Sequence, residues 1–137
     1  MRYFGQFPSE AQYVNIILPE IQEDEPPNNI KYEKFEPYML KAIIDNEYEP
    51  DDAERLLAAF KLIDEQKKGF IDVDAMKMIM IEKGIKFVNA EWEDFMQYAA
   101  DQETNTINYE DYVAKLVQEN EDHLEKLMKG YEKSNAL

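Results

Sequence analysis

Cysteine is absent from this sequence, which excludes disulfide bonds, thiolate metal ligands and cysteine nucleophiles and is compatible with a reducing compartment. Long apolar runs are absent as well, because no stretch approaches the roughly 20 residues that a membrane helix needs. The first twelve residues also lack the basic and then apolar pattern of a signal peptide. We therefore expect a soluble protein of the cytoplasm.

Basic residues are scarce. Fifteen Lys and Arg stand against thirty Asp and Glu, which gives a net charge of -15 and a pI near 4.4. Such a surface repels phosphate backbones and anionic lipids, so we expect no binding to nucleic acid or membranes. Gly (4) and Pro (6) are few, whereas hydrophobic residues make up 45% of the 137 residues, which predicts a folded chain of one domain or two small lobes.

Catalytic residue patterns are also missing. His123 is the only histidine, and it has no cysteine or second histidine to act with. Thirty acidic residues in a short chain place some pairs close together by chance, so such pairs are no sign of acid–base chemistry. The sequence has no glycine-rich phosphate loop and no zinc-ligand spacing. We predict that the chain is not an enzyme.

Apolar residues three and four positions apart predict four amphipathic helices. They carry Tyr13, Ile16 and Ile17; Leu56, Leu57, Phe60 and Ile63; Trp92, Phe95 and Met96; and the stretch from Tyr109 to Met128. Capping residues are predicted at Ser9 with Gln12, at Asp51 with Glu54, and at Asn89. Pro19 predicts that the first helix ends or kinks near Leu18, and Gly130 predicts the end of the last helix.

A short pattern occurs three times, centred on Ile30, Ile71 and Ile107. Each isoleucine is followed by any residue, an apolar residue, an acid, any residue and an apolar residue. Each segment follows a helical stretch and a polar loop and precedes another helix, which is typical of EF-hand helix–loop–helix repeats. In that motif the isoleucine is at loop position eight, where paired loops form a small antiparallel ladder.

The predicted fold is therefore all-α, with EF-hand repeats and a C-terminal helical extension. Residues 1–46 would hold the end of one hand and a second hand, residues 47–118 a C-terminal pair of hands, and residues 119–137 the extension.

A calcium-binding loop needs oxygen ligands at positions one, three and five, Gly at position six and a bidentate Glu at position twelve. The middle loop runs from Asp64 to Ala75 and has Gln66 and Lys68 at ligand positions and Gly69 at the turn. Ala75 replaces the bidentate Glu. Asp64, Gln66 and Asp72 therefore form only a weak candidate for a metal site.

The other two loops fit calcium no better. The last loop begins at Ala100 and ends at Asp111, or begins at Asp101 and is one residue short. The first loop, Glu23 to Lys34, has Pro27 at a ligand position and a lysine at position twelve. We expect no metal and no cofactor, calcium included.

Methionines and aromatic residues cluster in the predicted C-terminal pair. Because residues two apart lie on different helix faces, Met78 should point away from Met76 and Met80. Under an acidic rim, such side chains would form a groove for a basic amphipathic helix. The predicted groove residues are Met76, Met80, Phe87, Trp92, Phe95 and Met96. The alternative is that these side chains only fill an irregular core.

The extension contains an apolar stripe that could form a docking helix. The stripe consists of Leu124, Leu127, Met128 and Tyr131. The alternative is a charged, solvated helix whose end frays after Gly130.

These repeats resemble those of the calmodulin superfamily. The opening of the chain, MRYFGQFPSEAQ, is similar to the segment that ends a first hand and enters a second. Within the superfamily the chain is most similar to the EF-hand family known as subunit eight of the nexin–dynein regulatory complex. That resemblance covers about residues 20 to 117 and rests on four segments. They are KYEKFEPYMLKAII, YEPDDAERLLAAFKLID, KKGFIDVD and DQETNTINYEDYV.

The resemblance implies a non-catalytic structural subunit in the axoneme of motile cilia or flagella that contributes to the regulation of dynein-driven motility. Its partners would be other subunits of that complex, held through basic amphipathic, IQ-like or coiled-coil helices. No direct contact with tubulin would be required, since both surfaces are acidic. The main interpretation is function without calcium, and the alternative is a calcium sensor that acts through the middle loop.

The resemblance also implies that hand two is present without most of hand one. The apolar face around Tyr13, Ile16, Ile17, Phe35 and Met39 should then be covered by a further segment or a partner.

Overall fold

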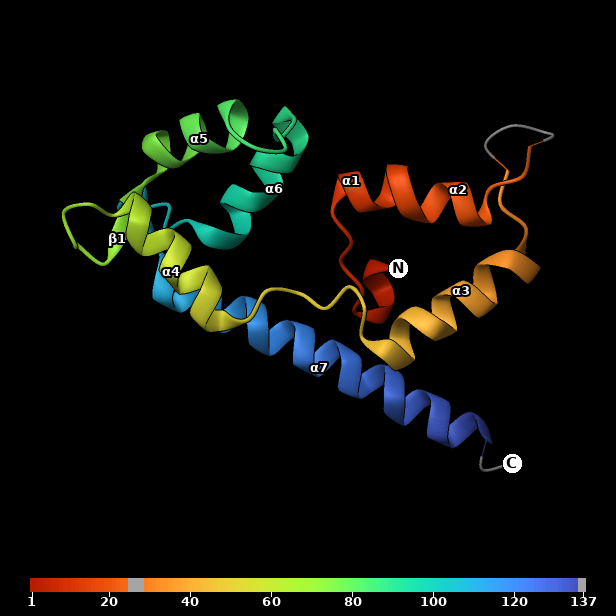
Figure 1. The fold of residues 1–137 in the computed structure, drawn as a ribbon. Coiled ribbons are helices and arrows are strands. Elements are labelled where there is room, and N and C mark those ends of the chain that lie inside the picture. Colours follow the sequence, from red (N-terminus) through yellow and green to blue (C-terminus); the bar gives the residue numbers. More distant parts are fainter. Residues whose placement is uncertain (25–28, 136–137) are drawn as a thin grey trace. The chain divides into compact units, whose positions relative to one another are not determined.

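The computed structural model describes residues 1–24 and 29–135. In residues 131–135 it describes the backbone and, among the side chains, only that of Lys133. The chain divides into two compact units, Met1–Pro50 and Asp51–Leu137, each of which is considered by itself (Figure 1). The division falls four residues after the predicted boundary between residues 46 and 47. The predominance of helix confirms the predicted all-α class. None of the helices in the described ranges is long and apolar enough to cross a membrane.

In the described residues of the first unit, 1–24 and 29–50, there are five short or medium helices. They are the 3₁₀ turn η1 (Arg2–Phe4), α1 (Glu10–Gln12), the π-helical turn η2 (Tyr13–Ile17), α2 (Leu18–Ile21) and α3 (Tyr32–Asp45). Ile17, Ile21, Ala42 and Tyr48 form its buried cluster. The Tyr48 backbone N–H donates to Oε1 of the buried Gln6 at 3.0 Å, which ties the segment after α3 to the N-terminal segment.

The helical run from α1 to α2 begins at the predicted residue, but it does not end at Pro19. Ser9 Oγ accepts from the Gln12 N–H, and Gln12 Oε1 accepts from the Ser9 N–H, which confirms the capping box. The helix does not end near Leu18. The Leu18 N–H reaches back five residues to the Tyr13 carbonyl, and this wider π turn directly precedes Pro19. Helical backbone therefore continues to Ile21, and Pro19, which has no N–H to donate, lies at the change from the π turn to α-helix.

The apolar face predicted to lack cover is partly buried within the structure. Ile17 and Met39 are buried, and Phe35 packs against the cluster of the first unit. Tyr13 and Ile16 remain 43% and 45% exposed. The prediction of an uncovered face therefore applies to these two residues and was wrong for Ile17 and Met39.

The second unit contains two helix–loop–helix hands. The first is α4 (Ala53–Ile63), β1 (Phe70–Asp72) and α5 (Val73–Glu82), and the second is α6 (Asn89–Ala99), β2 (Thr106–Asn108) and α7 (Tyr109–Asn135). Strands β1 and β2 pair antiparallel with Ile71 opposite Ile107, which confirms the predicted ladder. Ile30 instead forms an isolated bridge with Gln22 inside its own loop.

Three predicted helix ends differ in the structure. The cap of α4 is Asp52, whose Oδ1 accepts from the Arg55 N–H at 2.8 Å, and not Asp51. Asn89 is the first helical residue of α6 and not its cap. The side chain of Glu91 accepts a hydrogen bond from the N–H of Val88, the residue before the helix.

The third difference is at Gly130, which does not end the last helix, because α7 continues to Asn135 (Figure 1). Residues 119–135 of the predicted extension thus form the second half of α7 and no separate element, and residues 136–137 lie outside the described residues.

The core of the second unit lies between its four helices and the two-stranded ladder. Its buried residues are Phe60, Ile71, Val73, Met76, Trp92, Ile107, Tyr109 and Val113. Aromatic rings continue the packing across three helices: Phe60 of α4 contacts Tyr109 and Tyr112 of α7, and Phe95 of α6 contacts Tyr112. This core positions both loops and the predicted groove residues.

Candidate functional site

The six predicted groove residues lie together in the second unit, and most belong to its core. Met76 and Trp92 are only 3% and 6% exposed. Met80, Phe95 and Met96 are partly buried and pack against the same cluster. These five side chains therefore lie in or against a single core cluster.

Phe87 stands at the edge of this cluster. Its ring is nearly perpendicular to that of Phe95, with centroids 6.1 Å apart, and the Phe95 ring lies 5.5 Å from that of Trp92. Met78, by contrast, is 62% exposed, which confirms that it points away from Met76 and Met80. Five of the six residues lie in or against one core cluster, and we call the six together the seam. Met78 lies on the solvent side of α5.

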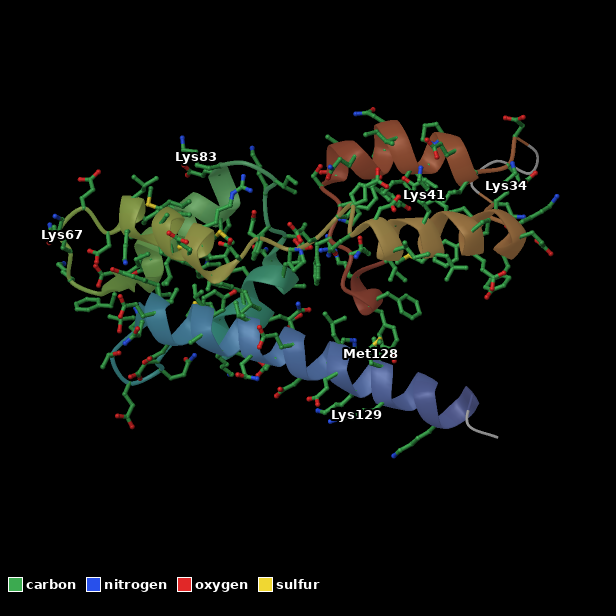
Figure 2. All side chains as sticks on the ribbon, turned by 60° about the horizontal axis from the view of Figure 1, so that its bottom comes forward. Lys34, Lys41, Lys67, Lys83, Met128 and Lys129 are labelled. Atoms are coloured by element: carbon green, nitrogen blue, oxygen red, sulfur yellow. The ribbon has the colours of Figure 1, made fainter. Side chains whose placement is uncertain are left out.

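The predicted docking stripe on α7 is mixed in exposure. Leu124 and Leu127 are partly buried, and Met128 is 62% exposed (Figure 2). The side chain of Tyr131 lies outside the described residues. An ion pair between Lys129 and Glu125, four residues apart, lies on the same helix.

The middle loop keeps the geometry of a hand but uses its first carboxylate internally. Oδ1 of Asp64 accepts from the Lys68 N–H at 3.0 Å, and Oδ2 accepts from the Gly69 N–H at 2.8 Å and from the Tyr109 hydroxyl at 3.0 Å. Asp64 is buried, whereas Gln66 and Asp72 are exposed.

The pKa of Asp64 is lowered, first by the backbone hydrogen bond from Lys68, then by those from Gly69 and the Tyr109 hydroxyl, while burial opposes the shift. Sequence reasoning missed the hydroxyl of Tyr109, 45 residues away, because only the pairing of the two loops brings it to Asp64.

The last loop uses Asp101 in a similar way. Asp101 Oδ1 accepts from the N–H groups of Glu103 and Thr104, at 2.8 and 3.3 Å, and these bonds lower its pKa. Asn105 has a φ of 54° at the turn. Asp111 lies in the first turn of α7, and its N–H donates to Asn108. Of the two loop starts predicted, Ala100 and Asp101, only Asp101 has a carboxylate, and its hydrogen bonds hold the turn.

The first loop has a different arrangement. Lys34 Nζ lies 3.1 Å from one oxygen of Glu23, and Lys31 Nζ lies 3.5 Å from the other. Pro27, predicted at a ligand position, lies outside the described residues. Among residues 1–24 and 29–135, no group of three or more acidic or histidine side chains is arranged to hold a metal ion.

Comparison with known proteins agrees with this fold. A solved structure of Mlc1p bound to IQ2 of Myo2p, a class V myosin, matches with a TM-score of 0.65 at 15% identity, covering 84% of this chain and 78% of that one. The paired helix–loop–helix hands, joined through the Ile71–Ile107 ladder, and this structural likeness show an EF-hand fold of the calmodulin-like type.

Sequence relatives narrow the class further. Dynein regulatory complex protein 8 of Mus musculus is 38% identical over 117 residues, which are 85% of this chain and 71% of the mouse protein. The chain belongs to the dynein regulatory complex protein 8 family. The Homo sapiens protein of the same name is 34% identical over 83 residues, which are 61% of this chain but only 30% of the human protein. No general model of a protein family matches the sequence.

Proposed function

We propose that this chain is a non-catalytic, calmodulin-like structural subunit of the dynein regulatory complex in the axoneme of motile cilia or flagella. The observation that carries the proposal is the sequence match to mouse dynein regulatory complex protein 8, which covers 85% of the chain. In this role the chain contributes to the regulation of dynein-driven motility. It is held by other subunits of the complex and needs no direct contact with tubulin.

The second unit is the part that binds a partner helix. Met80, Phe87, Phe95 and Met96 are only partly buried, so a modest separation of α5 and α6 exposes methionine and aromatic surface along one seam. A net charge of -15 favours an occupant that is basic as well as amphipathic. The solved Mlc1p is bound to an IQ segment, and a helix of this kind is the partner that we propose.

Binding of the helix does not require calcium. The first carboxylate of the middle loop already accepts three internal hydrogen bonds, and Ala75 offers no oxygen in place of the bidentate Glu. The alternative, a calcium sensor acting through this loop, requires Asp64 to exchange its internal donors for an ion.

A calorimetric titration tests the helix-binding proposal. The full chain is titrated with a basic IQ-type peptide in a calcium chelator, together with the variants M80Q and M78Q. M80Q places an amide in the seam and should weaken binding about tenfold or more, whereas M78Q makes the same change on the solvent side and should leave affinity within about twofold. Equal effects of the two variants, with helix content unchanged by circular dichroism, would contradict the seam assignment.

A second titration separates the two functional candidates. Calcium is added to the purified chain with magnesium present, and Trp92 fluorescence is followed in parallel. The structural proposal expects no binding heat up to millimolar calcium and no change in fluorescence. Micromolar binding that shifts Trp92 emission and is lost in D64A would favour the sensor.

A further inference from the structure

Glu23 and Lys34 are the first and twelfth residues of the first loop, at the end of α2 and the beginning of α3. The Lys34 ammonium lies 3.1 Å from Oε1 of Glu23, and the Lys31 ammonium lies 3.5 Å from Oε2, so each carboxylate oxygen has a cationic partner. The Glu23 side chain is 17% exposed, against 47% for Lys34 and 59% for Lys31. The carboxylate is thus the more enclosed partner, and the two lysines reach over it.

In a calcium-binding hand, positions one and twelve are both acidic, and the ion draws them together. Here position twelve is basic, so the two ends of the loop attract each other directly. The backbone is closed at the same place: the Glu23 N–H donates to the Asn29 carbonyl at 2.9 Å, and Gln22 bridges with Ile30. The described ends of the loop are therefore joined by two ion pairs and by backbone contacts.

We propose that the Lys34 ammonium is a built-in substitute for the divalent cation of this hand, with Lys31 as a second cationic contact to Glu23. The ammonium joins the end of α2 to the first turn of α3 and fixes the angle at which the two helices enter the loop. The pKa of Glu23 is lowered, with the hydrogen bond to Lys34 as the largest cause, as expected for a carboxylate held beside a cation. This device concerns residues 1–50 and operates whether or not the second unit binds a helix.

A charge-reversal experiment tests the proposal. K34E brings a second carboxylate to the end of the loop, so the two ends repel. Amide hydrogen exchange of the full chain is measured by NMR with and without millimolar calcium. We expect the Glu23 amide to exchange at least about fivefold faster in K34E with or without calcium, because Pro27 and Lys31 still stand at ligand positions. K34M should show a smaller acceleration, because it removes the attraction without adding repulsion, and the wild-type chain should not respond to calcium.

K41E is the matched control. Lys41 is an exposed lysine on the same helix, α3 (Figure 2). Within the described part of the chain it forms no ion pair. The variant therefore makes the same charge change away from the loop. The Tyr48 amide, which donates to the buried Gln6 side chain within the first unit, is the internal reference for unfolding of that unit. If it also accelerates in K34E, the comparison rests on K34M against wild type.

Two results would overturn the proposal. If K34E and K41E exchange at the same rate at Glu23, the pair is an ordinary surface ion pair that closes nothing. If K34M exchanges at the wild-type rate at Glu23 while K34E is faster, the acceleration comes only from the introduced repulsion, and the Lys34 ammonium does not hold the ends of the loop together.

Discussion

At the scale of single residues, Asp64 shows how a loop can keep the geometry of a hand while its first carboxylate is used internally. Its oxygens accept two backbone N–H groups of its own loop and the hydroxyl of Tyr109 from the start of α7. The carboxylate therefore links the two hands through a hydrogen bond in the place where other hands use an ion.

The lowered pKa of Asp64 predicts a particular dependence of stability on pH. Because the pKa of Asp64 in the folded chain lies below its usual value, the charged form stabilises the fold at pH above the unfolded pKa, and this stability is lost as pH falls through the folded pKa. We expect D64N to be less stable than wild type at pH 7, with a difference that shrinks between about pH 5 and pH 2. Thermal melts across this range check it, and parallel curves for the two proteins would contradict it.

Tyr109 permits a test of the link itself. Y109F removes the hydroxyl that donates to Asp64 but keeps the ring, which stacks on Phe60 with centroids 5.8 Å apart. We expect the melting temperature to fall by about 4 °C or more, since Asp64 loses a donor in a buried site. Y112F is the control, because the described contacts of Tyr112 are ring contacts with Phe60, Phe95 and Tyr98. An equal effect of both variants would argue against the link.

At the scale of elements, the hands could be predicted because their signals are local. The isoleucine pattern and helical periodicity lie within short segments, and they gave the ladder and the helices that flank it. The cap of α4 could not be assigned in the same way, because Asp51 and Asp52 are both chemically suitable. The extended backbone at Asp52, with φ -74° and ψ 168°, decides between them, and that follows from how the chain enters the helix.

Separate substitutions of these two aspartates test the assignment. D52A removes the acceptor for the Arg55 N–H and should lower the free energy of unfolding by about 1 kcal/mol. D51A removes only an exposed ion pair with the Arg55 side chain and should cost less than about 0.5 kcal/mol. Urea denaturation measures both. A larger effect of D51A would restore the cap that the sequence predicted.

Gly130 allows a similar test of where the last helix ends. Inside α7 an added Cβ would meet nothing within 4 Å, so G130A should stabilise the helix by up to about 1 kcal/mol and raise helix content. G69A makes the same change at a φ of +83° and should destabilise the middle loop. Circular dichroism and denaturation distinguish the two. A loss of stability in G130A would indicate that the helix stops at this glycine in solution.

At the scale of the whole molecule, what the sequence predicted best is family membership, because it is carried by several separate segments at once. It predicted less well how the groove residues are packed. Met and aromatic side chains at helical spacing suit an open groove and a closed core equally, and only long-range contacts place Met76 and Trp92 in the interior. The binding seam therefore stays a prediction that the M80Q and M78Q titrations test.

The net charge supplies a last prediction about partner binding. With thirty acidic and fifteen basic residues, long-range attraction should speed association with a basic helix, and salt screens this attraction with a Debye length of about 10 Å at 0.1 M. Association rates measured by stopped flow through Trp92 fluorescence should therefore fall severalfold between low salt and about 0.3 M salt, while the dissociation rate changes little, because apolar contacts in the seam are hardly screened. A neutral helix of the same apolar pattern is the control and should show little change in either rate. If both helices associate at the same salt-independent rate, the acidic surface does not select the partner.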